Sequence, residues 1–190
     1  MRLFTLLLLI VLAGCENLNP DVPTVFYNVD SLVNAQVNYL VEMRPEVVKT
    51  GEIREDAGES VVIPDSLQWT RELAIFRRAD INKPRLREQY SVEEGSDKDG
   101  EWISYTAQRE KNLPVRNLTI RYAGNRNQIR MLEALIKDVN PLYNSERLIQ
   151  MSFDQIDGTS VLSSYFIQGG QRMKLRDTVE FDLTAKVRYR

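Results

Sequence analysis

Residues 178–189 read TVEFDLTAKVRY, and the alternation of their side chains decides the fold class. Apolar side chains occupy the odd-numbered positions from Val179 to Tyr189, and polar or charged side chains occupy the even-numbered positions. Because successive side chains of a β-strand point to opposite faces of the sheet, this stretch predicts a strand with one buried face and one solvent-exposed face. Such strands are typical of an antiparallel sheet that is covered on one side.

The preceding part of the chain also predicts strands. Short runs of β-branched, aromatic and other apolar residues fall at 103–105, 115–122, 147–153 and 160–168. Asp157-Gly158 separates the last two runs and is a strong signal for a tight hairpin turn. We therefore expect a meander in which neighbouring strands are joined by short connections.

Three further segments of this region need separate interpretation. Residues 128–139 carry apolar side chains at helical spacing, but they lie between predicted strands, so both structures fit and we favour a strand. Gly169-Gly170 predicts a bulge or a bend. Residues 91–101 are rich in acidic side chains, and we expect a charged loop there.

Two helices are predicted nearer the N-terminus. Residues 30–43 place Leu32, Val33, Val37, Leu40 and Val41 on one stripe, and residues 64–80 do the same with Trp69, Leu73 and Phe76. Between the two helices, residues 46–63 fit either a two-stranded ribbon or an irregular excursion.

The expected fold is α+β, with two N-terminal helices packed on a curved antiparallel meander of about six strands. We expect a single domain over residues 28–190. The stripe of Trp69, Leu73 and Phe76 has two interpretations, namely the core between helix and sheet or the lining of a ligand cavity.

The composition excludes several classes of function. The chain of 190 residues has no histidine, a single cysteine and a formal net charge of −2. The chain therefore lacks the residues that Ser-His-Asp catalysis, Cys-His catalysis and ordinary zinc sites require. Its net charge does not suit a nucleic-acid-binding protein. Asp97 and Asp99 do not fit the register of a calcium loop. We expect no catalytic residues, no metal and no cofactor.

The N-terminus carries the most specific motif. Met1-Arg2 precedes the apolar run Leu3–Leu12, and Leu12-Ala13-Gly14 precedes Cys15. The run is too short to span a bilayer, but it suits a secretory signal peptide over residues 1–14. Leu12-Ala13-Gly14-Cys15 resembles the lipobox of bacterial lipoproteins. This resemblance implies export and a lipid anchor on Cys15.

The residues after the cysteine refine this expectation. Residues 15–27 contain two prolines and read as the lipidated cysteine followed by an extended linker. Glu16 is not the aspartate that retains lipoproteins of enteric bacteria in the inner membrane, so the resemblance implies the outer membrane. The expected architecture is similar to the half-barrel carriers and receptors of bacterial lipoproteins, which would imply an apolar cavity for acyl chains. Asp80-Ile81-Asn82-Lys83-Pro84 resembles a stretch of uncharacterised envelope lipoproteins.

A basic run follows the second predicted helix. Arg77, Arg78, Lys83, Arg85 and Arg87 lie within eleven residues. They form either a patch for a protein partner or anionic lipid headgroups, or a solvated helix end whose cations suit the helix dipole.

Three functions remain open at this point. The first is a lipid-anchored, non-enzymatic binding or scaffold protein that supports an envelope protein partner at the outer membrane. The second is a carrier or receptor for a lipid in the concave face of the sheet. The third is a hydrolase that uses carboxylates, such as those of Glu93 and Glu94, Asp97 and Asp99, or Asp154 and Asp157.

The lipid anchor can be tested directly. Cells that express the chain should incorporate labelled palmitate into it, and the Cys15→Ala variant should lose both the label and the partition into the membrane fraction. A variant with unchanged size and unchanged membrane partition would show that the lipobox interpretation is wrong.

Overall fold

The computed structural model describes residues 25–53, 56–108, 113–173 and 178–189. The signal peptide, Cys15 and the linker up to residue 24 lie outside the described residues. Within the described part of the chain, no helix has both the length and the apolar character needed to cross a bilayer.

The dominant element is one antiparallel sheet of nine strands, in the order β2-β1-β9-β8-β7-β6-β5-β4-β3. The strands are β1 (Glu46–Ile53), β2 (Asp56–Val62), β3 (Tyr90–Asp97), β4 (Gly100–Ala107), β5 (Val115–Tyr122), β6 (Ile129–Val139), β7 (Tyr143–Ile156), β8 (Thr159–Met173) and β9 (Val179–Arg188). Strands β3 to β9 form a continuous meander, and the early hairpin β1–β2 joins it through pairing of β1 with β9.

The α+β class is confirmed, but the expected number of about six strands is wrong. Residues 46–63 form the ribbon β1–β2, and the segment expected as a charged loop, 91–101, lies mostly in the hairpin β3–β4. The acidic side chains are compatible with a strand here because β3 lies at the edge of the sheet, where Glu93 and Glu94 are exposed.

Two further local predictions are confirmed, and a third is not. Residues 129–139 form strand β6, which pairs with β5 and β7 on its two sides. The turn at Asp157-Gly158 has positive φ at both residues (49° and 78°), as a two-residue hairpin turn requires. The expected bulge at Gly169-Gly170 is wrong, because the register runs through both residues without a shift.

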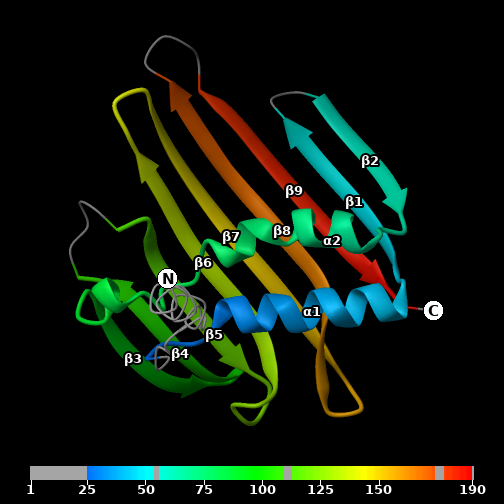
Figure 1. Ribbon diagram of the computed structural model, residues 1–190, viewed down its shortest axis with the longest axis horizontal. Coiled ribbons are helices and arrows are strands. Elements are labelled where there is room, and N and C mark those ends of the chain that lie inside the picture. Colours follow the sequence, from blue (N-terminus) through cyan, green and yellow to red (C-terminus); the bar gives the residue numbers. More distant parts are fainter. Residues whose placement is uncertain (1–24, 54–55, 109–112, 174–177, 190) are drawn as a thin grey trace, which may run out of the picture.

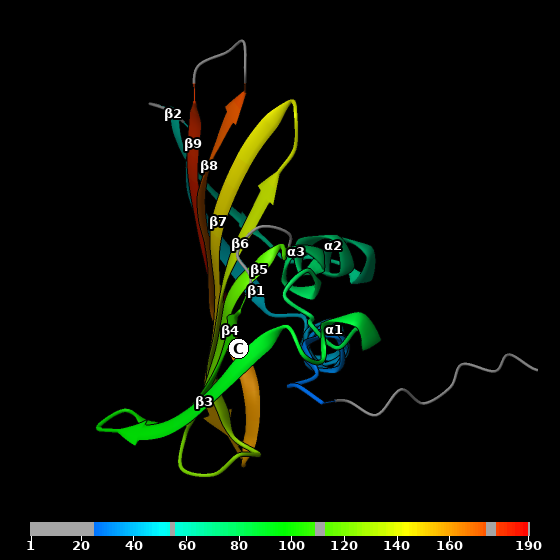
Figure 2. The same cartoon turned by 90° about the vertical axis from the view of Figure 1, so that its left-hand side faces the viewer.

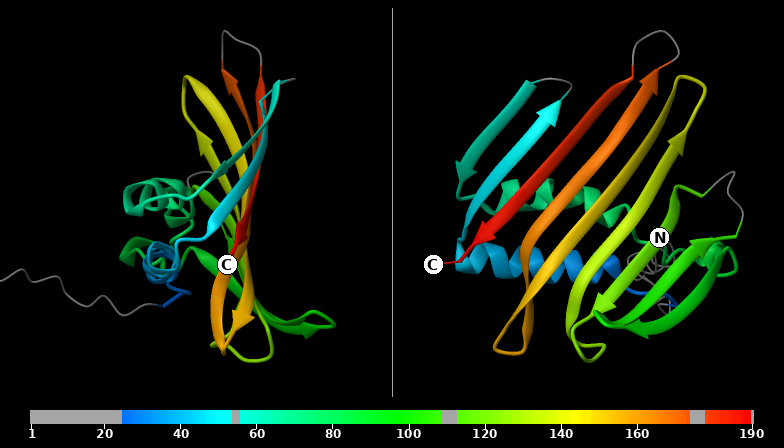
Figure 3. Two further views of the ribbon diagram at one scale, coloured as in Figure 1. Left: turned by 90° about the vertical axis from the view of Figure 1, so that its right-hand side faces the viewer. Right: turned by 180° about the vertical axis from the view of Figure 1, so that it is seen from behind.

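Three helices cross one face of the sheet. They are α1 (Val29–Met43), α2 (Ser66–Glu72) and α3 (Ala74–Arg77), followed by a 3-10 turn at Pro84–Leu86. The side views show all of them on the same side of the sheet, and the opposite face carries no helix (Figures 2 and 3).

The predicted helix over 64–80 is broken into two. A capping box between Asp65 and Gln68 starts α2. The regular helix ends at Leu73, where the next backbone bond, from Phe76 N–H to the Leu73 carbonyl, follows the tighter 3-10 pattern. The apolar spacing survives the break, because Trp69, Leu73 and Phe76 are all fully buried.

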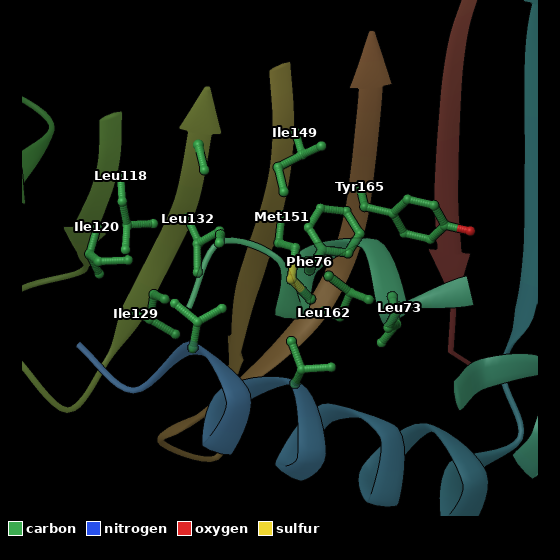
Figure 4. Close-up of a cluster of buried hydrophobic side chains, with 14 of the residues drawn as sticks. Leu73, Phe76, Leu118, Ile120, Ile129, Leu132, Ile149, Met151, Leu162 and Tyr165 are labelled. Carbon is green, nitrogen blue, oxygen red and sulfur yellow. The ribbon is translucent and has the colours of Figure 1, made fainter. Parts of the chain in front are cut away.

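The core lies between the helices and the sheet. Alternate residues of the central strands, such as Leu132, Ile149 and Met151, point toward the helices and are buried (Figure 4). The Gln36 side chain of α1 is also buried, and it donates to the Ser160 carbonyl at 2.9 Å and accepts from Leu162 N–H at 2.8 Å. These two bonds attach the middle of α1 to strand β8.

The packed part of the chain begins before the expected boundary at residue 28. Phe26 is buried, and its ring meets those of Tyr90 and Tyr105 edge to face at 5.8 and 5.3 Å. Residues 26 and 27, which we had assigned to the linker, therefore belong to the domain.

Two adjacent glycines of β8 give a sharp test of the fold. A Cβ at Gly169 would lie 2.4 Å from the Glu146 carbonyl oxygen and 3.1 Å from the Phe181 ring, whereas a Cβ at Gly170 would meet nothing closer than 3.8 Å. We expect Gly169→Ala to lower the free energy of unfolding by about 1–3 kcal/mol. Gly170→Ala should leave it unchanged or raise it by about 0.4–1 kcal/mol.

Urea denaturation of both variants would measure this difference. Equal stabilities for Gly169→Ala and Gly170→Ala would contradict the register of β7, β8 and β9.

Candidate functional site

The longest strands extend well beyond the helices that cover them. β7 has 14 residues and β8 has 15, which at about 3.3 Å per residue makes each almost 50 Å long. Helices are about 10 Å wide, so two of them side by side cover about 20 Å. Figure 1 shows both ends of β7 and β8 protruding past α1 and α2. A large part of the helix-bearing face is therefore not covered by helices.

The uncovered part contains an open groove of about 1020 Å³. Its lining comes from β1, β2, β8 and β9, and its apolar side chains are Ile167, Val179, Phe181 and Leu183. The same alternating stripe of β9 continues toward α1 and α2 as Ala185 and Val187, which are buried. The groove is thus the continuation of the core surface beyond the helix layer.

Small residues give the groove its depth on the side of the N-terminal hairpin. One row across the strands runs Ile167, Leu183, Gly51 and Gly58 in register. Because Gly51 and Gly58 lack side chains, β1 and β2 form a low shelf beside the bulky residues of β8 and β9. A Cβ at Gly58 would meet nothing within 4 Å, whereas a Cβ at Gly51 would lie 3.3 Å from the Asp182 carbonyl oxygen, so the open space of the shelf is at Gly58.

A polar cluster lies at the end of the groove nearest α2. Lys49 lines the groove, and its Nζ donates to Glu72 Oε2 at 2.5 Å. The Tyr165 hydroxyl donates to Glu72 Oε1. Burial, and after it the hydrogen bond to Glu72, raise the pKa of Tyr165 above its usual range. Among the described residues that line the groove, Lys49 is the one cation, and Glu72 neutralises it.

The predicted stripe of Trp69, Leu73 and Phe76 lies in the core and not in the groove. All three side chains have no exposed surface, and the Phe76 ring meets Tyr165 edge to face at 5.8 Å (Figure 4). Trp69 Nε1 is buried without a hydrogen-bond partner among the described residues. None of the three side chains lines the groove.

The five predicted basic residues are not equivalent. Arg77 binds Asp30 and Asn34 of α1, and Arg78 binds Asp138 of β6 at 2.6 Å, so both hold the helix layer together. Lys83, Arg85 and Arg87 are exposed.

The carboxylate pairs suggested for hydrolysis lie on exposed strands and turns. Asp97 binds Arg121 at 2.8 Å, Glu94 binds Arg126, and none of the suggested acids lines the groove. In the described ranges of the chain, no three acidic or cysteine side chains gather closely enough to hold a metal ion.

A second hollow lies on the opposite face of the sheet. It measures about 450 Å³ and forms around Gly170, whose neighbours in register are Glu146 and Glu180. Leu135 and Leu148 make its apolar part. It has fewer apolar side chains than the groove and lies among acidic residues.

The sequence did not single out the residues of the groove. The alternation in residues 178–189 was a usable signal, but it could not show which of the apolar residues the helices leave uncovered. Gly51 and Gly58 lie among charged residues between the short β-branched runs 47–48 and 61–63, and their spacing gives no sign of a groove.

The cluster at the end of the groove predicts a dependence of stability on alkaline pH. An unfolded tyrosine ionises near pH 10, whereas the folded chain keeps Tyr165 protonated above that pH. The stabilising contribution is therefore present below pH 10 and is lost as the pH rises. Each such tyrosine should lower the free energy of unfolding by about 1.4 kcal/mol per pH unit in this range.

Urea denaturation at several pH values above 10 would measure the slope. Tyr165→Phe should reduce the slope of the free energy of unfolding against pH by the contribution of one proton, about 1.4 kcal/mol per pH unit. Glu72→Gln serves as a control that removes the charge of residue 72 but keeps a hydrogen-bond acceptor there. An unchanged slope in Tyr165→Phe would show that this hydroxyl is not held protonated by the fold.

Comparison with known proteins adds no assignment, since no family model, no curated protein and no solved structure matches this chain.

Proposed function

We propose that this protein is a lipid-anchored, non-enzymatic envelope protein of the outer membrane that binds a lipophilic ligand in the groove. The observation that carries the proposal is the half-buried apolar stripe of β9 that lines the groove, namely Val179, Phe181 and Leu183. Sites for small lipophilic ligands are typically concave and lined in large part by apolar side chains. The lipobox supports the location, because it predicts an anchor on Cys15.

The shape and chemistry of the groove favour a single apolar chain. Its large side chains, Ile167, Phe181 and Leu183, are apolar, while Asp56, Glu59 and Asp182 also line it. Its one cation among the described residues is paired with Glu72 at one end. Burial of about eight methylene groups would contribute roughly 6 kcal/mol, before the cost of immobilising the ligand. Such a ligand would be an acyl chain or a similar lipophile that the protein holds reversibly.

A protein partner is a second candidate, and the edge strand β2 favours it. All seven residues of β2 are exposed, and β2 pairs only with β1 among the described strands. Exposed sheet edges of this kind can accept an extended segment of another protein as an additional strand.

Two glycines provide a matched pair of variants for the lipid proposal. Gly58→Trp would place an indole in the groove without a local clash, whereas Gly170→Trp would fill the hollow on the opposite face. We expect Gly58→Trp to lower the affinity for a fluorescent single-chain lipid at least roughly tenfold, which corresponds to about two methylene contacts. Gly170→Trp should bind the probe as the unmodified chain does.

Native mass spectrometry of the protein isolated from envelopes would identify a natural ligand. Equal probe binding by both variants, or a chain isolated without any lipid, would contradict the lipid proposal. Recovery of a specific envelope protein in mild detergent, with no lipid bound, would favour the partner at β2 instead.

A further inference from the structure

The point at which the chain enters the domain is fixed to the basic loop after α3. Asn82 accepts from Phe26 N–H at 3.0 Å and donates to the Tyr27 carbonyl at 3.0 Å. Asp80 accepts from Asp30 N–H at 3.1 Å. These bonds attach residues 26–30 directly to the segment that precedes Lys83. A lipid anchor on Cys15 would therefore be connected to the domain at a point next to this loop.

A hollow of about 240 Å³ lies at the same loop, and we call it the basic hollow. Arg78, Lys83 and Arg85 line it together with one acid, Asp80. Asp80 already accepts backbone N–H groups through both carboxylate oxygens, from Asp30 and from Asn82. Among the described residues, the hollow thus combines three cations with a single carboxylate whose oxygens are both engaged.

Two of these cations are available to a ligand. Lys83 and Arg85 are exposed, and neither takes part in an ion pair within the described ranges of the chain. Arg78 contributes in part, because its Nη2 is bound to Asp138. Arg77 does not belong to the hollow, since its guanidinium is bound to Asp30 and Asn34.

We propose that the basic hollow binds the phosphate of an anionic phospholipid headgroup in the membrane that carries the anchor. Lys and Arg near an anionic membrane surface each raise the affinity about fivefold. The ten residue steps from Cys15 to Val25 span at most roughly 35 Å, so a lipid anchor on Cys15 would keep the start of the domain within that distance of the membrane surface. The inference rests on the membrane location in the proposed function but not on the groove.

The apolar part of the hollow suits this ligand as well. Leu86 and Tyr90 line it, and Tyr90 also packs against Phe26, the residue by which the chain enters the core. A headgroup in the hollow would thus contact the same packed unit that receives the linker. Headgroup binding would fix the orientation of the domain on the membrane, which a linker alone leaves undefined.

The test uses a chain of residues 16–190, which has no acyl group and keeps every contact of the described structure. We expect it to float with vesicles of phosphatidylcholine and phosphatidylglycerol but not with vesicles of phosphatidylcholine alone. The double variant Lys83→Gln/Arg85→Gln should lower the affinity for the anionic vesicles roughly 30-fold. The control Lys98→Gln/Lys186→Gln removes the same charge from exposed positions elsewhere and should stay within about twofold of the unmodified chain.

Several outcomes would overturn the inference. They are the absence of binding to anionic vesicles, equal losses in the two double variants, or binding of inorganic phosphate by the unmodified chain without any partition to vesicles. The last outcome would assign the basic hollow to a free anion.

A second measurement uses the full chain after lipidation. In vesicles, hydrogen exchange at residues 82–87 should be slower with phosphatidylglycerol than without it, and the difference should vanish in Lys83→Gln/Arg85→Gln. Palmitate labelling at Cys15 without this protection would overturn the headgroup site and leave the anchor intact. Loss of palmitate labelling, with flotation of residues 16–190 retained, would overturn the anchor and leave the headgroup site intact.

Discussion

The helix layer of this protein is narrower than the strands beneath it are long, and most other features depend on this mismatch. The helices cover the middle of a nine-stranded sheet and leave both ends of the longest strands uncovered (Figure 1). Where they cover the sheet, its side chains form the core. Where they do not, the same apolar stripe of β9 becomes the floor of the groove. Core and candidate site are therefore two parts of one surface.

The pairing of β1 with β9 determines where the groove can form. It adds the early hairpin to the end of the meander, so that Gly51 and Gly58 come to lie beside Leu183. Lys49 of the same hairpin then reaches Glu72 of α2, which connects the added strands to the helix layer. Without this pairing, β9 would be an exposed edge strand and Phe181 would have no shelf beside it.

The fold could be predicted from the sequence wherever a local pattern was decisive. The alternation in 178–189, the turn at Asp157-Gly158 and the stripe of α1 were sufficient in this way. Strand β3 was missed because an edge strand exposes most of its side chains, so its acidic residues resembled those of a loop. The break at Leu73 left no signal, since the buried spacing of Trp69, Leu73 and Phe76 is the same with or without it.

The candidate sites depend on partners that are distant in the sequence, and this is why the sequence could not resolve them. Five cations of one short run looked alike, yet Arg77 is bound to Asp30 and Arg78 to Asp138, which lie 47 and 60 residues away. Those ion pairs use the charge of two residues to hold α3 between α1 and β6. The charge that remains available at Lys83 and Arg85 lies beside Asn82, which binds the entering chain. The same short run thus contains cations that are bound within the fold and cations that are exposed, and the hollow beside the entering chain is lined by both kinds.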